Sequence, residues 1–316
     1  MPRAAVLEQP SMLRVGIVGD RDSGKTTFLG LLYAAQVRSG TDKTDDFRFH
    51  AAIESLEEIT VVFQRLMSGS FPDTATKEGF HEVGFRLGYR KPGFGFPLLR
   101  SREWGRASFA TVRFCLLRTS DPAIARLLGG SAVADGTLRD ILDADAVAIF
   151  VDCAKLGTRA EVPQAGPMGE YDAAVASLLT AIQRWRERGG RRTLYPIFVF
   201  SKFDRVRSEV LRDAKVASAP PRGSKRGPRA AYAEAILTHN IPKTLAKLRG
   251  QDRRGLRFAA PAYFFSWLRT DESVPGHPAR VRLRRVKDAG WEPDYSTDEY
   301  LGFLACLQDI AAHTEA

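Results

Sequence analysis

Three scarcities limit what this chain of 316 residues can be. Cysteine occurs only three times, at Cys115, Cys153 and Cys306. So few cysteines, without the spacing of metal ligands, exclude a disulfide scaffold and a cysteine-based metal site. We expect free thiols, with Cys115 and Cys153 buried, and a reduced, cytoplasmic setting. Long apolar runs are also missing: the longest, over 144–154, is interrupted by two aspartates, so we predict no membrane span. No segment resembles a signal peptide.

What is present indicates a globular protein with a basic surface. Hydrophobic residues make up 44% of the chain and charged residues 27%, which suits one large domain, or one domain carrying insertions. The formal net charge is +10, and the basic residues gather over 186–192, 222–229, 249–257 and 280–287. Such clusters suit an acidic partner, an anionic membrane or nucleic acid. Because no aromatic residues alternate with them, we favour a solvated surface over a nucleic-acid site.

The most specific pattern in the chain is a phosphate-binding loop of the form G-x-x-x-x-G-K-[ST], here Gly19-Asp20-Arg21-Asp22-Ser23-Gly24-Lys25-Thr26. An apolar run over 13–18 predicts a buried strand before it, and the apolar spacing over 28–35 predicts a helix after it. Strand, glycine loop and helix form the context that this motif requires. The alternative is an ordinary strand-to-helix turn with a solvated lysine, which the combined context disfavours.

The chemistry of such a loop points to a nucleoside triphosphate. Its backbone N–H groups surround the phosphates, and the following helix adds its positive N-terminal end. Lys25 would reach the outer phosphates and act in catalysis, and the Thr26 hydroxyl would ligate Mg²⁺. The predicted binding residues of the loop are Gly19, Asp22, Ser23, Gly24, Lys25, Thr26 and Thr27.

A second motif concerns the base. Ser201-Lys202-Phe203-Asp204 follows an apolar strand over 195–200, and it resembles the NKxD guanine-specificity motif of P-loop GTPases, with Ser in place of Asn. The Asp204 carboxylate can accept hydrogen bonds from guanine N1–H and the 2-amino group, whereas adenine would leave it unpaired. Lys202 would lay its aliphatic stem across the base, and Ser201 would tie this loop to the phosphate loop. A polar turn without function is the alternative.

The next predicted strand ends in Phe264-Phe265-Ser266-Trp267. Ser266 falls where the same GTPases carry a short SA-type motif that supports the guanine O6 through backbone N–H. Trp267 replaces the usual small residue, and core packing is its alternative role. In this order the motifs resemble the TRAFAC (Ras-like) class of GTPases, and more narrowly a divergent prokaryotic branch with a Gly-x-Phe-Pro…Thr segment, here 69–76.

The resemblance implies an α/β, three-layer P-loop NTPase fold. It would have a Ras-like, mixed but mostly parallel sheet of six strands with helices on both faces. Apolar segments that alternate with helical patterns indicate the same class, and the strands near 83–89 and 112–117 should form an antiparallel pair. We expect one GTPase domain over 1–316, with helical and loop insertions near 40–80, 91–106, 205–229 and 271–293.

The chain departs from this family at the DxxG motif. Arg118 stands at the expected Asp and Asp121 at the expected Gly, while Pro122 stands where a water-orienting Gln often lies. The Mg²⁺ water shell therefore loses a partner, and fast hydrolysis and a conventional γ-phosphate switch are both unexpected.

Several residues have two possible roles. Arg21 is either a built-in arginine finger or a solvent-exposed side chain, and Asp22 either helps to bind K⁺ or braces the loop. Thr74 or Thr76 could supply a second Mg²⁺ ligand. Asp152, at the end of the apolar run 148–151, is either a Walker B metal ligand or a structural residue.

We therefore expect a protein that binds GTP and GDP with Mg²⁺ and hydrolyses GTP slowly until a protein partner or activator completes the site. The first alternative is a non-catalytic pseudo-GTPase used for assembly or signalling. The second is an ATPase or nucleotide kinase that uses Asp152.

Overall fold

The structure is a computed structural model, and it describes residues 11–39, 49–73, 76, 81–91, 106–121, 124, 136–161, 166–187, 193–222, 226–250, 256–271, 279–286 and 290–314. Among the helices in these ranges, none combines the length and the apolar character needed to cross a membrane.

A central sheet of eight strands organises this part of the chain, in the order β2-β3-β4-β1-β5-β6-β7, with β8 also paired to β6. The strands are β1 (Ser11–Gly19), β2 (Phe49–Ala51), β3 (Glu82–Lys91), β4 (Arg106–Arg118), β5 (Ala146–Asp152), β6 (Thr193–Ser201), β7 (Arg257–Phe258) and β8 (Ala262–Phe265). The pairs β2–β3 and β3–β4 are antiparallel and the other pairs are parallel. The predicted mixed, mostly parallel sheet and its antiparallel pair are thus confirmed. The two strands beyond the six expected, β2 and β7, have three and two residues, too few for a periodic pattern.

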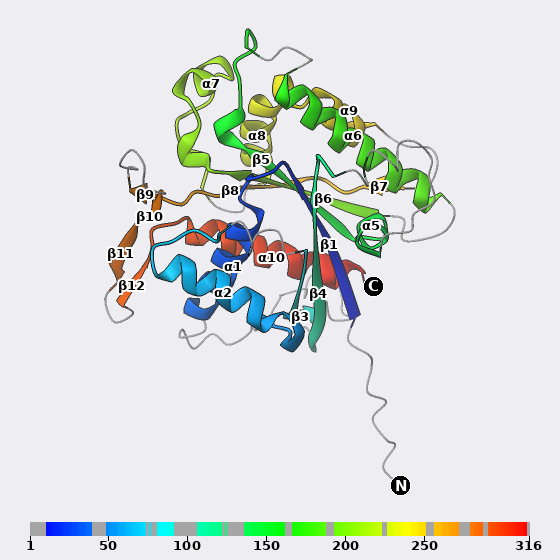
Figure 1. The fold of residues 1–316 in the computed structure, drawn as a ribbon. Coiled ribbons are helices and arrows are strands. Elements are labelled where there is room, and N and C mark those ends of the chain that lie inside the picture. The colour runs from blue at the N-terminus through cyan, green and yellow to red at the C-terminus, as the bar shows by residue number, and fades with distance from the viewer. Residues whose placement is uncertain are drawn as a thin grey trace, which may run out of the picture.

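Helices cover both faces of the sheet, which gives the three layers of the predicted α/β fold (Figure 1). One face carries α1 (Lys25–Ser39), α2 (Leu56–Met67) and α10 (Thr297–Thr314). The other carries α5 (Gly136–Leu142), α6 (Pro167–Arg186), α8 (Arg226–Asn240) and α9 (Pro242–Arg249). Only Ile241 separates α8 from α9, and Pro242 begins α9, where its missing N–H costs no helical hydrogen bond.

Strand periodicity explains the two hydrophobic layers. Successive side chains of a strand point to opposite faces, so Ala146, Ala148 and Phe150 of β5 join the cluster under α1 and α10. Val147, Ile149 and Val151 join the cluster under α6 and α8. Every residue of β5 is buried, as expected for a strand covered by helices on both faces.

Phe303 of α10 sits at the centre of the first cluster, fully buried, with ring centroids 5.1 Å from Phe28 and 5.4 Å from Phe264. We expect Phe303→Ala to lower the free energy of unfolding by about 3–5 kcal/mol, because the lost burial leaves a cavity that close packing cannot fill. Urea denaturation measures this. Phe109→Ala is the control, since Phe109 is 45% exposed and should cost under about 1 kcal/mol. Equal losses in the two variants would contradict this assignment of the core.

The insertions take different forms. The segment near 271–293 makes two small hairpins, β9 (Thr270–Asp271) with β10 (Arg280–Val281), and β11 (Leu283–Val286) with β12 (Gly290–Pro293). The predicted insertion after 205 contains α7 (Ser208–Asp213), which buries Val210 and Leu211. The segment near 40–80 contains β2 and α2, and most of 91–106 lies outside the described residues.

Cys115 and Cys153 are buried free thiols, as predicted.

Candidate functional site

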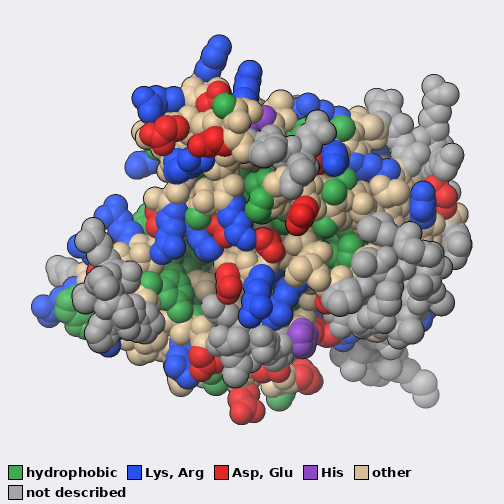
Figure 2. All heavy atoms as spheres, turned by 45° about the horizontal axis from the view of Figure 1, so that its top comes forward, with side chains coloured by type: hydrophobic (Ala, Val, Ile, Leu, Met, Phe, Trp, Pro, Cys, Tyr) green, Lys and Arg blue, Asp and Glu red, His purple; other side chains and the backbone are tan. Residues whose placement is uncertain are grey.

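A cavity of about 420 Å³ opens where β1, β4, β6 and β8 end. Two sequence-distant loops line it: the phosphate loop between β1 and α1, and the loop after β6. Its volume falls within the range of small-molecule sites, and the carboxyl ends of parallel strands are where open α/β sheets bind ligands. Figure 2 shows several Lys and Arg side chains gathered about a hollow on this face.

The phosphate loop has the tight geometry that its glycines predict. Gly24 has φ +84°, a left-handed conformation that favours glycine, and Asp22 has φ 57°, which Asp tolerates better than most residues. A Cβ at Gly19 would lie 2.6 Å from Ser23 Oγ and 2.8 Å from Phe150 Cβ, so a side chain there requires the loop to move. Gly19 itself is not among the residues that line the cavity.

Lys25 is buried at the first position of α1 and faces back into the loop. Its Nζ donates to Gly19 O (2.9 Å), Asp20 O (2.7 Å) and Ser23 Oγ (3.3 Å). Burial, and after it the nearby charge of Arg118, lower the pKa of Lys25 to about 8. An anion in the cavity would relieve both effects, so the loop holds its lysine in a state that favours a negatively charged ligand.

A brace that the sequence did not reveal holds the start of this loop. Lys155, in the 3₁₀ helix Cys153–Lys155 after β5, pairs with the Asp20 carboxylate. Burial opposes ionisation of Asp20, but hydrogen bonds from Lys155 and from the Arg21 N–H outweigh it and lower its pKa. Because 135 positions separate Asp20 from Lys155, no local pattern could predict the pair.

The loop after β6 places its two predicted base-binding side chains on the cavity wall. Lys202 and Asp204 both line it. Burial raises the pKa of the Asp204 carboxyl, while the N–H of Leu268 donates to it and acts in the opposite direction. The Phe203 N–H donates to Ser266 O (3.0 Å), which ties this loop to the one after β8.

Ser201 does not act as the sequence predicts. It lines the cavity, but its hydroxyl donates to Val151 O (3.2 Å) and not to the phosphate loop. The two loops meet through packing, since a Cβ at Gly24 would lie 3.8 Å from Ser201 Cβ.

The structure favours the structural interpretation of Asp152. Its carboxylate accepts from the Ala154 N–H (3.1 Å) and forms an ion pair with Lys202 Nζ (2.7 Å). The register of β5 against β6 sets Asp152 opposite Ser201, next to the base-binding loop, and it is not among the residues that line the cavity. Asp152 thus positions Lys202.

The loop after β8 departs from the prediction. The Ser266 N–H donates to Phe200 O (2.8 Å), continuing the β6–β8 ladder, and the Trp267 N–H donates to Ser296 Oγ (3.1 Å). A guanine O6 would have to displace one of these acceptors. Trp267 does not line the cavity and packs against the hydrophobic cluster under α6, so core packing is the role that the structure gives it. Ser266 does line the cavity, with its hydroxyl 2.7 Å from Tyr300 Oη.

Thr76 is not among the residues that line the cavity. Its N–H donates to Asp73 Oδ1 (2.8 Å), and Asp73 pairs with Arg65 of α2. Its alternative Thr74, like Pro122, lies outside the described residues.

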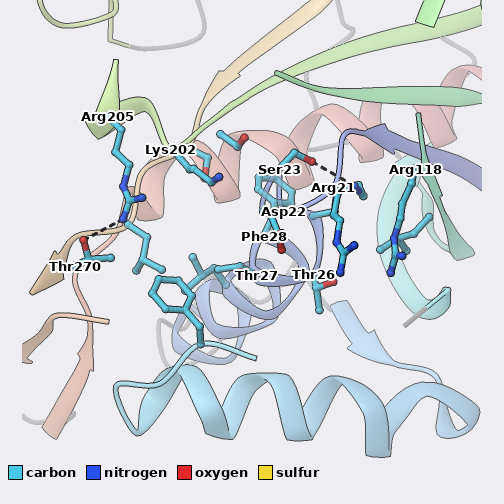
Figure 3. A pocket seen from close by; sticks show the side chains of 18 of the residues that line it. Arg21, Asp22, Ser23, Thr26, Thr27, Phe28, Arg118, Lys202, Arg205 and Thr270 are labelled. Atoms are coloured by element: carbon cyan, nitrogen blue, oxygen red, sulfur yellow. Dashed lines mark hydrogen bonds between the residues drawn. The ribbon is translucent and has the colours of Figure 1, made fainter. Parts of the chain in front are cut away.

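Sequence reasoning missed part of the wall. Phe71, His81, Leu268, Thr270 and Ala279 also line it, and the Arg205 guanidinium contacts Thr270 Oγ1 at 3.4 Å (Figure 3). These residues come from four separate segments that only the folded chain brings together. The one available signal was the Gly-x-Phe-Pro segment that contains Phe71.

The end of the cavity beside the phosphate loop is cationic. Arg21 and Arg118 line it together with Lys25. In Figure 3 the side chains of Arg21 and Arg118 lie on one side of the phosphate loop, and those of Lys202 and Arg205 lie on the other. Arg118 ends β4 in register with Gly19, which ends β1. The cavity thus has one end beside the phosphate loop, rich in positive charge, and a second end that contains the Asp204 carboxylate.

One predicted Mg²⁺ ligand, Thr26, lies on the wall of the cavity. Mg²⁺ commonly takes few protein oxygens beside phosphates and waters. Thr26 therefore fits such an ion. The position expected to hold a carboxylate at the end of β4 holds the Arg118 cation instead.

No known family model matches the sequence, and no curated protein matches it. Similar solved structures include two of the Ski7 GTPase-like domain of S. cerevisiae, one bound to GDP and inorganic phosphate and one bound to GTP. Their sequence identities are 12% and 13% and their TM-scores are 0.35 and 0.31. Each alignment covers 81% of this chain and 43% of that chain, so this chain spans less than half the length of these structures. A likeness this distant leaves the function to be argued from the geometry of the cavity.

Proposed function

We propose that this protein binds GTP and GDP with Mg²⁺ and hydrolyses GTP slowly. One observation carries the proposal: a single cavity joins Lys25 and the phosphate loop at one end to Lys202 and Asp204 at the other. The ends match a nucleotide, whose polyanionic tail needs amides and cations and whose guanine base presents two N–H donors to one carboxylate. We also keep the TRAFAC class, a prokaryotic branch and a cytoplasmic single domain of 1–316 as parts of this proposal.

The base end would select guanine through Asp204. Lys202, held in place by Asp152 at 2.7 Å, would cover one face of the base with its aliphatic stem. Adenine cannot donate to Asp204 from the matching positions, and leaving a carboxylate unpaired in a closed cavity is costly. Discrimination by an unmet hydrogen bond is stronger than discrimination by shape alone.

The phosphate end would bind through the loop amides, Lys25 and Thr26. Thr26 would hold Mg²⁺, which when bound neutralises charge on the β- and γ-phosphates. Asp22, at φ 57° beside the loop amides, is the proposed contact for K⁺. Arg21 lines the cavity, which supports the arginine-finger hypothesis over a wholly solvent-facing side chain.

Hydrolysis would be slow because the segment after β4 lacks the usual water-positioning groups. Arg118 and Asp121 occupy the expected Asp and Gly positions of DxxG, and catalysis of phosphoryl transfer depends on positioning and charge. A protein partner or activator would complete the site. The basic surface clusters leave a nucleic-acid partner as a lesser proposal, which salt-insensitive or absent binding to DNA and RNA would remove.

A single-turnover assay tests hydrolysis directly. Protein in excess over radiolabelled GTP, with Mg²⁺ and with or without K⁺, should release phosphate slowly, and K⁺ should raise the rate if Asp22 helps to hold it. GTP that stays intact for hours in both buffers would favour the pseudo-GTPase alternative. The cation at Arg118, in place of a metal-linked carboxylate, is the observation that favours this alternative.

The ATPase hypothesis makes a separate prediction for Asp152. If Asp152 only positions Lys202, Asp152→Asn should weaken GTP binding by about 3- to 10-fold, the worth of one partly buried charged contact. Equilibrium binding should give the same factor with Mg²⁺ and with EDTA. A loss confined to the Mg²⁺ buffer, together with a preference for ATP, would support a Walker B role.

A further inference from the structure

We propose that Arg118 binds the outer phosphates of the nucleotide directly, and that the pocket therefore retains guanine nucleotide without Mg²⁺. The inference rests on the proposed function and concerns how the same site neutralises its ligand. It gives a role to the residue at which the chain departs most clearly from GTPases of the family it resembles.

The position of Arg118 is fixed by the sheet. β4 runs parallel to β1, and the last pair in their register is Arg118 opposite Gly19. The next residue, Thr119, donates its N–H to Gly19 O (3.2 Å). Arg118 therefore leaves the sheet at the point where the phosphate loop begins, and it lines the same cavity as Lys25 and Thr26.

The side chain is available for a ligand. Within the described part of the chain, the Arg118 guanidinium makes no hydrogen bond and no ion pair, whereas the side chains of many other described arginines, such as Arg186, Arg207 and Arg229, are hydrogen-bonded. It is only half-exposed, and Figure 3 shows it reaching along the phosphate loop on the same side as Arg21. A partly desolvated guanidinium without a partner is stabilised by an anion that can accept from it.

The chemistry of the group suits phosphate oxygens. A guanidinium is planar and permanently charged, and it donates two parallel hydrogen bonds to a phosphate. A carboxylate at the same position would act on phosphate only through Mg²⁺ and its waters. The exchange of Asp for Arg therefore replaces a metal-mediated contact with a direct one, and Lys25 and Arg21 add two more cations to the same end of the cavity.

Binding of a fluorescent GTP analogue should be measured in Mg²⁺ and in EDTA, for wild type and for Arg118→Ala, Arg118→Lys and Arg118→Asp. Wild type should keep its affinity within about threefold when Mg²⁺ is removed. Arg118→Ala should lose about 10- to 100-fold in EDTA, the range of a charge-assisted pair, and Arg118→Lys should recover part of it. Arg118→Asp should bind in Mg²⁺ and lose binding in EDTA. Arg212→Ala, on the exposed face of α7, is the control and should match wild type.

The outcomes separate the two proposals. A wild type that binds GTP in Mg²⁺ but loses 100-fold or more in EDTA overturns the role of Arg118 and leaves the proposed function standing. An Arg118→Ala variant that folds and binds like wild type in EDTA also overturns the role of Arg118 and leaves the proposed function standing. A wild type that binds guanine nucleotide in neither buffer removes the proposed function, and the inference falls with it.

Discussion

Lys25→Ala is expected to weaken GTP binding by about 100-fold or more, because the ammonium would make several charge-assisted contacts to phosphate in a desolvated loop. In the free protein Lys25 Nζ is held beside the loop by two loop carbonyls and Ser23 Oγ, so a phosphate oxygen would replace one of these acceptors. Isothermal calorimetry with GTP measures the loss.

The matched control is Lys243→Ala, on the exposed side of α9. It removes the same charge and should leave the affinity unchanged. If Lys25→Ala keeps a native melting curve and wild-type affinity, the loop does not bind phosphate, and an ordinary strand-to-helix turn becomes the better interpretation of the motif.

Asp204→Asn should change which base is bound. GTP should weaken by about 100-fold, since the amide presents a donor to a guanine donor and leaves both unpaired. Xanthosine triphosphate should bind more tightly than to wild type, because its 2-oxo group accepts from the new amide. A competition panel of GTP, xanthosine triphosphate and ATP measures both changes at once.

Glu209→Gln is the control for this substitution. Glu209 lies in α7, five positions away, and pairs with Arg212 at the surface. Its base preference should match wild type. Should Asp204→Asn keep the wild-type order of nucleotides, Asp204 does not contact the base and the guanine assignment is wrong.

Local patterns predicted the parts of this protein that are contiguous in sequence. The phosphate loop needs a strand, a glycine turn and a helix in succession, and β1, Gly24 and α1 supply them within a short stretch of chain. The buried strand β6 was predicted for the same reason, since 195–200 is a single apolar run. Such signals do not depend on what the rest of the chain does.

Contacts between segments that are distant in sequence could not be predicted from local patterns. The pair of Asp152 with Lys202 depends on the β5–β6 register, and the brace of Asp20 by Lys155 depends on the turn after β5. Without them, the sequence left the role of Asp152 open between a metal ligand and a structural residue.

The loop after β8 shows a different limit of sequence-based prediction. Its motif predicted a backbone N–H that binds guanine, whereas in the folded chain the N–H groups of this loop bond to other parts of the protein. The Ser266 N–H extends the sheet and the Trp267 N–H binds Ser296 beside α10. A short motif fixes residue types, whereas the hydrogen bonds of its backbone are decided by neighbours that the motif does not contain.

The central claim is that the cavity takes up a guanine nucleotide. Calorimetric titration of the unaltered protein with GTP and with ATP, at equal Mg²⁺, tests it most directly. We predict a saturable GTP isotherm with one site per chain and an ATP affinity at least about 100-fold lower, the usual worth of an unmet buried hydrogen bond. Heat of dilution alone with both nucleotides, or tighter binding of ATP, would contradict it.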